Sequence, residues 1–142
     1  MDTATGTLVT YKMYIDGQWV DSASGRHFES HNPYTGKPWA LIPRGNAEDV
    51  DRAVRAARKA FTSGEWPKLT PTRRGALLRK LGDLIADKSK LLAEIEVRDN
   101  GKLIAEMSAQ TAYMAQWYYY YGGLADKLEG AVIPIDKPDT FN

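Results

Sequence analysis

The stretch that decides the fold runs from Asn46 to Phe61 and reads NAEDVDRAVRAARKAF. Asparagine is a preferred N-cap residue, and the acidic residues that follow it suit the positive end of a helix dipole. Gly64 is expected to end the helix. The apolar residues recur at helical spacing and form one stripe, made up of Val50, Ala53, Val54, Ala57 and Phe61. The pattern therefore predicts an amphipathic helix that needs a second surface to cover its apolar side.

Short strands are predicted on the N-terminal side of this helix. Aromatic and β-branched residues flank Asp16-Gly17, a dipeptide typical of two-residue hairpin turns, so strands are expected at about 12–15 and 18–21. A third strand is expected over His27–His31 and a fourth over Trp39–Ile42. Residues 1–10 are expected to form a flexible tail.

Further helices are predicted on the C-terminal side. One begins at Thr70-Pro71, a capping residue followed by proline at the first helical position. Its apolar face is expected to carry Leu77, Leu78, Leu81, Leu84 and Ile85. A bend over 87–89 is expected to separate it from a segment that ends at Asn100-Gly101 in a left-handed cap.

The last helix is expected over about 102–129, followed by a short strand over 131–135. Four consecutive tyrosines in this helix must point in different directions. Tyr118 and Tyr121 are expected to pack, and the others are expected to reach polar partners through their hydroxyls.

Composition excludes several classes of function. Nineteen basic and eighteen acidic residues leave a net charge of +1, which gives no long-range field to collect nucleic acid or an anionic membrane. No apolar run reaches the ~18 residues that a membrane span needs, and the start does not resemble a signal peptide, so a cytoplasmic location is expected. The 142 residues contain no cysteine, which excludes disulfides and a cysteine nucleophile within them.

Phosphate and transition-metal sites are not predicted. No Gly-rich pattern of the G-x-G-x-x-G or G-x-x-x-x-G-K type is present. His27 and His31 share one face of a predicted strand, but two ligands without a third do not make a metal site.

Six segments stand in a recognisable order and spacing. They are YIDGQWV (14–20), NPYTG (32–36), AEDVDRAV leading to AARKAF (47–61), Trp66 and Arg74 before LLRKL (77–81), DNGK (99–102), and YYYGGLADKLEG (119–130) before Ile133-Pro134. Together they resemble the N-terminal region of the aldehyde dehydrogenase superfamily.

This resemblance implies an α/β fold: N-terminal strands plus amphipathic helices of an aldehyde dehydrogenase-like fold, with residues 11–142 as the N-terminal segment of an incomplete Rossmann-type cofactor domain. The family oxidises aldehydes to carboxylic acids through a Cys thiolate, hydride transfer to NAD or NADP, and hydrolysis assisted by a Glu base. None of those positions maps onto residues 1–142, so no catalytic or cofactor-contacting residue is carried over. The chain is expected to be a truncated fragment that is catalytically inert and binds no coenzyme alone.

One minor site is implied by the same resemblance. Some family members hold a structural monovalent cation through main-chain oxygens and the acid of the Asp-Asn-Gly-Lys turn. Here the ligands would be the carbonyls of Ser30 or His31 and the carboxylate of Asp99. A hard cation would need further oxygen ligands from outside these residues.

The partners that the resemblance implies are the remainder of the enzyme chain or homologous subunits, since intact family members are homo-oligomers. No nucleic-acid or membrane partner is expected. The alternative is a stand-alone, non-catalytic interaction module that uses its apolar helix faces to bind a homologous subunit or another protein.

Overall fold

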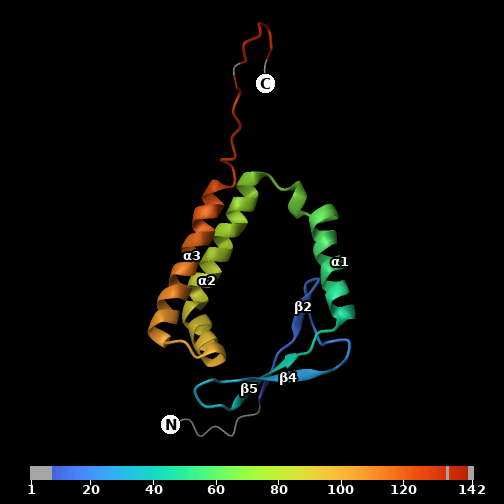
Figure 1. The fold of residues 1–142 in the computed structure, drawn as a ribbon, viewed down its shortest axis with the longest axis vertical. Helices are drawn as coiled ribbons and strands as arrows, with labels where there is room; N and C mark the ends of the chain where they lie inside the picture. The colour runs from blue at the N-terminus through green and yellow to red at the C-terminus, as the bar shows by residue number, and fades with distance from the viewer. Residues whose placement is uncertain (1–7, 134, 141–142) are drawn as a thin grey trace.

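The computed structural model describes residues 8–133 and 135–140. Figure 1 shows helices α2 (Pro71–Asn100) and α3 (Ile104–Leu124) side by side as an antiparallel pair. Helix α1 (Ala47–Ser63) stands across an opening from this pair, and the strands lie at the lower end, near the start of α1 and the α2–α3 connection. The segment after α3 extends away from the opposite end. None of the helices formed by the described residues combines the length and hydropathy that a bilayer span requires.

The predicted hairpin is confirmed. Strand β2 (Met13–Ile15) pairs antiparallel with β3 (Gln18–Val20). Both turn residues have left-handed backbone angles, with φ of 51° at Asp16 and 78° at Gly17. This combination is what a type I′ turn requires, and it explains the Asp-Gly dipeptide.

A second, three-stranded sheet has the order β1-β5-β4. Strand β4 (His27–His31) is confirmed as predicted and pairs antiparallel with β5 (Pro38–Pro43), which extends the expected fourth strand by one residue at each end. The prediction of a flexible tail over residues 1–10 was wrong for its last two residues, which form a strand. Strand β1 (Val9–Thr10) pairs parallel with β5; residues 1–7 lie outside the described part.

Helix α1 begins as predicted. The Asn46 side chain accepts a hydrogen bond from the Asp49 backbone N–H at 3.1 Å, and Asp49 Oδ2 accepts one from the Asn46 N–H at 3.0 Å. This reciprocal capping box satisfies two helix-terminal donors. Gly64 is the C-cap, as expected.

The expected bend within the second helix was wrong, because α2 runs unbroken over 30 residues from its Thr70 cap. It follows a short 3-10 turn, η1 (Trp66–Lys68). No proline and no glycine lies between residues 83 and 100, so nothing in that part of the chain breaks the hydrogen-bond ladder. Its end is confirmed: Gly101 is a left-handed C-cap with φ 77°.

The last helix is shorter than predicted, and ends at Leu124. Gly122 and Gly123 come just before this end, and each glycine disfavours helix by about 1 kcal/mol relative to alanine. The expected strand over 131–135 was also wrong for the described residues 131–133 and 135, which lie in no strand. An extended segment becomes a strand only when another strand pairs with it.

Mostly small residues form the interface between α2 and α3, which we call the glycine seam. Its buried members are Gly75, Gly82 and Ala93 of α2 and Met107, Thr111, Ala115 and Gly122 of α3. A Cβ added at Gly75 would collide with the carbonyl oxygen of Gly122. One added at Gly82 would lie 2.7 Å from the Tyr119 ring. Only glycine therefore allows the two backbones to approach this closely.

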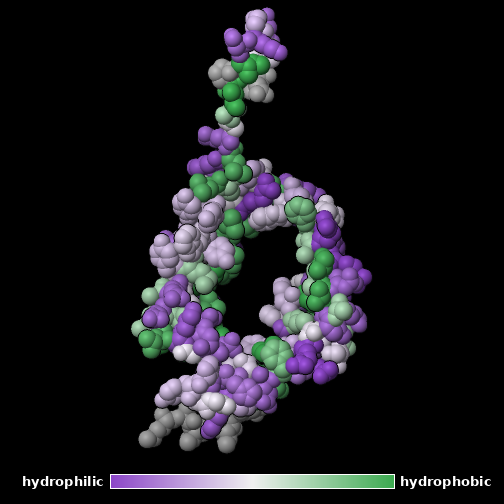
Figure 2. Space-filling model, viewed as in Figure 1, coloured by the Kyte–Doolittle hydropathy of each residue, from purple (hydrophilic) through white to green (hydrophobic). Residues whose placement is uncertain are grey.

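The large apolar side chains lie mostly outside the seam. Among the described residues, no large side chain is fully buried. Leu77, Leu81 and Leu84 of α2 are 42–51% exposed, and the stripe residues Val54 and Phe61 of α1 are 59% and 70% exposed. Figure 2 shows hydrophobic surface on both sides of the opening between α1 and the helix pair. The stripes that the sequence predicted as buried thus remain uncovered within this chain.

Candidate functional site

The end of α2 meets β4 at the position where the sequence predicted a cation site. Ser30 of β4 donates a hydrogen bond from its hydroxyl to Asp99 Oδ1 at 2.5 Å, across 69 residues of sequence. The structure therefore brings together two of the three predicted residues. The third, His31, is the next residue of β4, and its Nε2 lies 3.3 Å from Glu29 Oε2.

Two contacts between α2 and the strand region hold this junction in place. Gly101 packs against the Pro33 ring, since a Cβ added at Gly101 would lie 3.2 Å from the Pro33 Cβ. The Arg98 guanidinium carbon lies 5.6 Å from the centre of the Trp39 ring, a cation–π distance. The Trp39 ring also makes an edge-to-face contact with the Tyr11 ring, with 6.0 Å between the ring centres and 74° between the ring planes. No local sequence pattern indicates the Arg98–Trp39 contact, because it joins residues from separate elements.

The chemistry of the junction is that of oxygen ligands. A carboxylate and a hydroxyl suit a hard cation better than a transition metal. Across the part of the chain that the structure describes, no group of three or more His, Asp or Glu side chains could hold a metal ion. His27 and His31 are the first and last residues of β4.

Asp49 is a second organising carboxylate, and the sequence indicated only its place in the first turn of α1. It is 2% exposed, and its Oδ1 accepts a hydrogen bond from the Ala23 backbone N–H at 2.9 Å. The Ser22 hydroxyl lies 2.8 Å from its Oδ2 and 2.7 Å from the Arg44 carbonyl oxygen. The Ala23 hydrogen bond, followed by those from Asn46 and Ser22 and the charge of Arg52, outweighs burial and lowers the pKa of Asp49.

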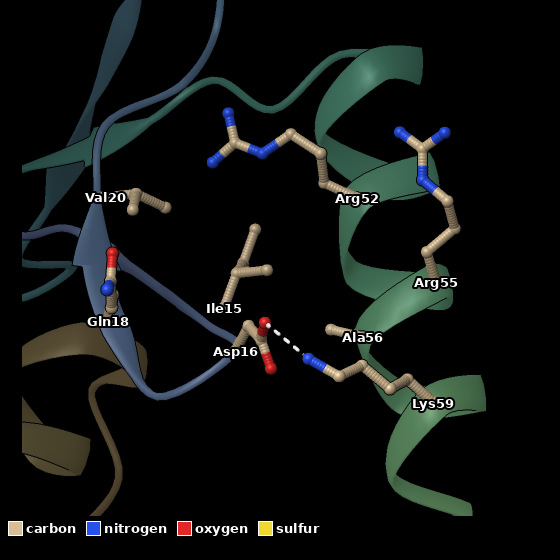
Figure 3. Close-up of a pocket in the computed structure, with 8 residues that line it drawn as sticks. All are labelled: Ile15, Asp16, Gln18, Val20, Arg52, Arg55, Ala56 and Lys59. Carbon is tan, nitrogen blue, oxygen red and sulfur yellow. Dashed lines mark ion pairs between the residues drawn. The ribbon is translucent and has the colours of Figure 1, made fainter. Parts of the chain in front are cut away.

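A shallow pocket of about 330 Å³ lies between the β2–β3 hairpin and α1. In Figure 3 the hairpin side presents Ile15 and Asp16, and α1 presents Lys59 and two arginines. Lys59 Nζ lies 3.7 Å from Asp16 Oδ2. The arginines also have carboxylate partners, Arg52 with Asp49 at 3.7 Å and Arg55 with Asp51 at 2.8 Å. Because each cation is already matched by an anion, the pocket has no unbalanced charge to attract a phosphate.

The tyrosine run of α3 behaves only partly as predicted. Tyr118 is half-buried, and the hydroxyl of Tyr119 donates a hydrogen bond to Asp83 Oδ1 at 2.9 Å. Tyr121, which was expected to pack, is 56% exposed. Successive side chains of a helix point about 100° apart, so Tyr121 lies off the face on which Gly122 meets α2.

Comparison with known proteins identifies the family to which the chain belongs. The model of the aldehyde dehydrogenase family matches residues 19–142. A dehydrogenase from Acinetobacter baylyi, named for (Z)-2-((N-methylformamido)methylene)-5-hydroxybutyrolactone, is 48% identical over 129 residues, which are 91% of this chain and 26% of that protein. Aldehyde dehydrogenase family 2 member B4 of Arabidopsis thaliana is 42% identical over 88% of this chain and 23% of that protein.

Solved structures agree with this assignment. The NAD-dependent aldehyde dehydrogenase of Sinorhizobium meliloti matches with a TM-score of 0.85 and 36% identity, over 93% of this chain and 26% of that one. A betaine aldehyde dehydrogenase mutant of Staphylococcus aureus, in complex with NAD+, matches with a TM-score of 0.84 and 38% identity over 94% of this chain. The chain thus spans about a quarter of the length of these relatives and corresponds to their N-terminal part. The mixed α/β fold is confirmed, and the chain belongs to the aldehyde dehydrogenase family.

Proposed function

We propose that residues 1–142 form the N-terminal structural part of an NAD(P)-dependent enzyme that oxidises aldehydes to carboxylic acids. The observation that carries this proposal is the match of nearly the whole chain to about a quarter of each relative. In this proposal the thiolate nucleophile, the glutamate base and the coenzyme contacts come from outside these residues. The absence of cysteine from the 142 residues supports a thiolate nucleophile supplied from outside them.

The uncovered helix faces support the same proposal. Leucines on α2 and the valine and phenylalanine stripe on α1 are exposed, and Figure 2 shows hydrophobic surface on both sides of the opening. Apolar surface of this extent marks a place where another surface packs. The partner we propose is the remainder of the enzyme, and homologous subunits then complete a homo-oligomer. A cytoplasmic location stays a prediction.

A direct assay tests the catalytic half of the proposal. The 142-residue chain, mixed with an aldehyde and NAD+ or NADP+, is expected to form no NADH or NADPH, because it carries no thiol to attack the carbonyl. The coenzyme is expected not to bind to the chain alone. Turnover at the rate of an intact enzyme would contradict the proposal.

Solution behaviour separates this proposal from the alternative of a stand-alone interaction module. An enzyme part with uncovered apolar faces is expected to self-associate, and to gain stability, seen as a higher urea midpoint, when the rest of a relative is supplied. A chain that stays monomeric at high concentration and gains no stability from the rest of a relative would favour the module instead.

We also propose that Asp99, with main-chain oxygens of Ser30 or His31, holds a structural monovalent cation. The 2.5 Å hydrogen bond between Ser30 and Asp99 supports this, since it keeps the carboxylate beside β4. The melting temperature is then expected to be higher in potassium or sodium chloride than in choline chloride of equal ionic strength. Asp99→Asn should abolish that difference, and an unchanged difference would refute the site.

A further inference from the structure

The dipeptide Asn100-Gly101 joins the end of α2 to the loop before α3, and it has a chemistry of its own. Asparagine followed by glycine is prone to deamidation, because a residue without a side chain leaves its backbone nitrogen free to approach the asparagine amide carbon. Of the four asparagines in the sequence, Asn100 alone precedes a glycine. Asn46 precedes Ala47, and Asn32 precedes Pro33, whose ring nitrogen carries no hydrogen and cannot form the same intermediate.

The folded cap restrains every atom that this reaction would use. The Gly101 N–H, the nucleophile, donates a hydrogen bond to the Val97 carbonyl oxygen at 2.9 Å. The amide nitrogen of Asn100, the leaving group, donates to Glu96 Oε1 at 2.8 Å. The Asn100 amide oxygen accepts from the Lys102 N–H at 2.9 Å. As the last residue of α2, Asn100 also has a helical backbone, which must rotate before the Gly101 nitrogen can reach Cγ.

We propose that Asn100 is a deamidation site that the native cap keeps slow and that local opening of the end of α2 makes fast. In the reaction the Gly101 nitrogen loses its proton to solvent and bonds to Asn100 Cγ, and ammonia leaves to give a succinimide. Water then opens either carbonyl of the ring and yields aspartate or isoaspartate. Both residues are exposed, so water reaches the site once the cap opens.

The product would weaken the turn in which it forms. A carboxylate at position 100 faces Glu96 one helical turn earlier, and like charges at this spacing are destabilising. It also adds negative charge at the negative end of the helix dipole. The same turn holds Asp99 against Ser30 and Gly101 against Pro33, so the modification would loosen the junction between α2 and β4.

The test compares the folded chain with the same chain unfolded in urea, both at mildly alkaline pH. Peptide mass spectrometry follows the conversion of amide to carboxylate at each asparagine, and an Asn100→Asp chain supplies the chromatographic standard. In urea, Asn100 is expected to react much faster than Asn46, and Asn32 should not react. In the folded chain Asn100 is expected to react about tenfold more slowly, or slower still, because reaction must wait for local opening.

A matched pair of variants tests the role of the cap itself. Glu96→Ala removes the acceptor of the Asn100 amide and is expected to speed native deamidation roughly twofold to fivefold. Glu94→Ala introduces the same helix-favouring residue two positions earlier, where Glu94 pairs with Lys90 at 4.0 Å, and should leave the rate unchanged. Equal rates in the folded and unfolded chains, or equal effects of the two variants, would overturn the proposal.

Discussion

The α2–α3 pair and the strand-and-α1 region are held together by opposite means. The helix pair depends on the absence of side chains, since glycine at positions 75, 82 and 122 lets two backbones touch. The other region depends on one side chain, because the buried Asp49 carboxylate ties α1 to the loop after β3. Added bulk should therefore damage the first region, and lost charge should damage the second. In neither region is a large apolar side chain of the described residues fully buried.

The largest effect is expected from bulk in the glycine seam. Gly75→Val places methyl groups where the Gly122 carbonyl oxygen already lies, so α2 and α3 must separate. Overpacking of this kind costs about 1–3 kcal/mol or more. We expect a marked fall in the urea midpoint measured by far-UV circular dichroism.

Gly123→Ala is the matched control for this variant, because an added Cβ at Gly123 meets nothing within 4 Å. Replacing a helical glycine by alanine is worth up to about 1 kcal/mol in favour of the helix. The control should therefore keep or raise the midpoint. Similar losses in both variants would show that the close approach of α2 and α3 is not what stabilises the pair.

A smaller loss is expected from Asp49→Asn, which keeps the shape of the side chain but leaves one buried N–H without a strong acceptor. Asp51→Asn, on the same helix, removes a carboxylate that is 59% exposed and paired with Arg55, so it should change the urea midpoint little. Equal midpoints for the two variants would contradict the anchoring role of Asp49.

The dependence of stability on pH tests the same role of Asp49. The hydrogen bond from Ala23 and its companions lower the pKa of Asp49 below its ordinary value of 3.8, so the folded state favours the ionised form. This contribution to stability is complete above the unfolded pKa and is lost as the pH falls through the lower folded pKa. The urea midpoint should fall on acidification below about pH 4, and it should fall less in Asp49→Asn. The same acid loss in both chains would rule out Asp49 as its source.

The smallest effect is expected at the junction between the two regions. Arg98→Ala removes the guanidinium that lies over the Trp39 ring and should cost about 0.5–1 kcal/mol. Lys90→Ala removes a cation from the same helix that is 91% exposed, and serves as the control. Tryptophan fluorescence during urea unfolding measures both. A larger loss for Lys90→Ala would argue against the cation–π contact.

Local signals in the sequence predicted the parts of the fold that are governed by neighbouring residues. The Asp16-Gly17 turn, the Asn46 and Thr70 caps and the Gly101 cap depend on the chain within a few residues, and all of them are confirmed. The prediction was too long for the last helix. Apolar residues continue at helical spacing as far as Leu128, but the helix ends at Leu124, just after Gly122-Gly123.

The glycine seam could not be predicted, for a physical reason. Hydrophobic periodicity identifies faces that avoid water, but on α2 Leu77, Leu81 and Leu84 stay exposed, and only Leu78 and Ile85 of the predicted face are half-buried. The face that actually packs carries Gly75 and Gly82, which a sequence pattern treats as weak helix formers. The Ser30–Asp99 contact was expected only through the family resemblance, since no local pattern links residues 69 positions apart.

The most direct test of the account is a chimera. Residues 1–142 would replace the corresponding segment of the Staphylococcus aureus betaine aldehyde dehydrogenase, which matches this chain with a TM-score of 0.84. If these residues supply structure while the rest supplies the chemistry, the chimera will fold and reduce NAD+ with betaine aldehyde. A chimera that folds but forms no NADH would contradict the claim that this segment can serve as the N-terminal part of such an enzyme.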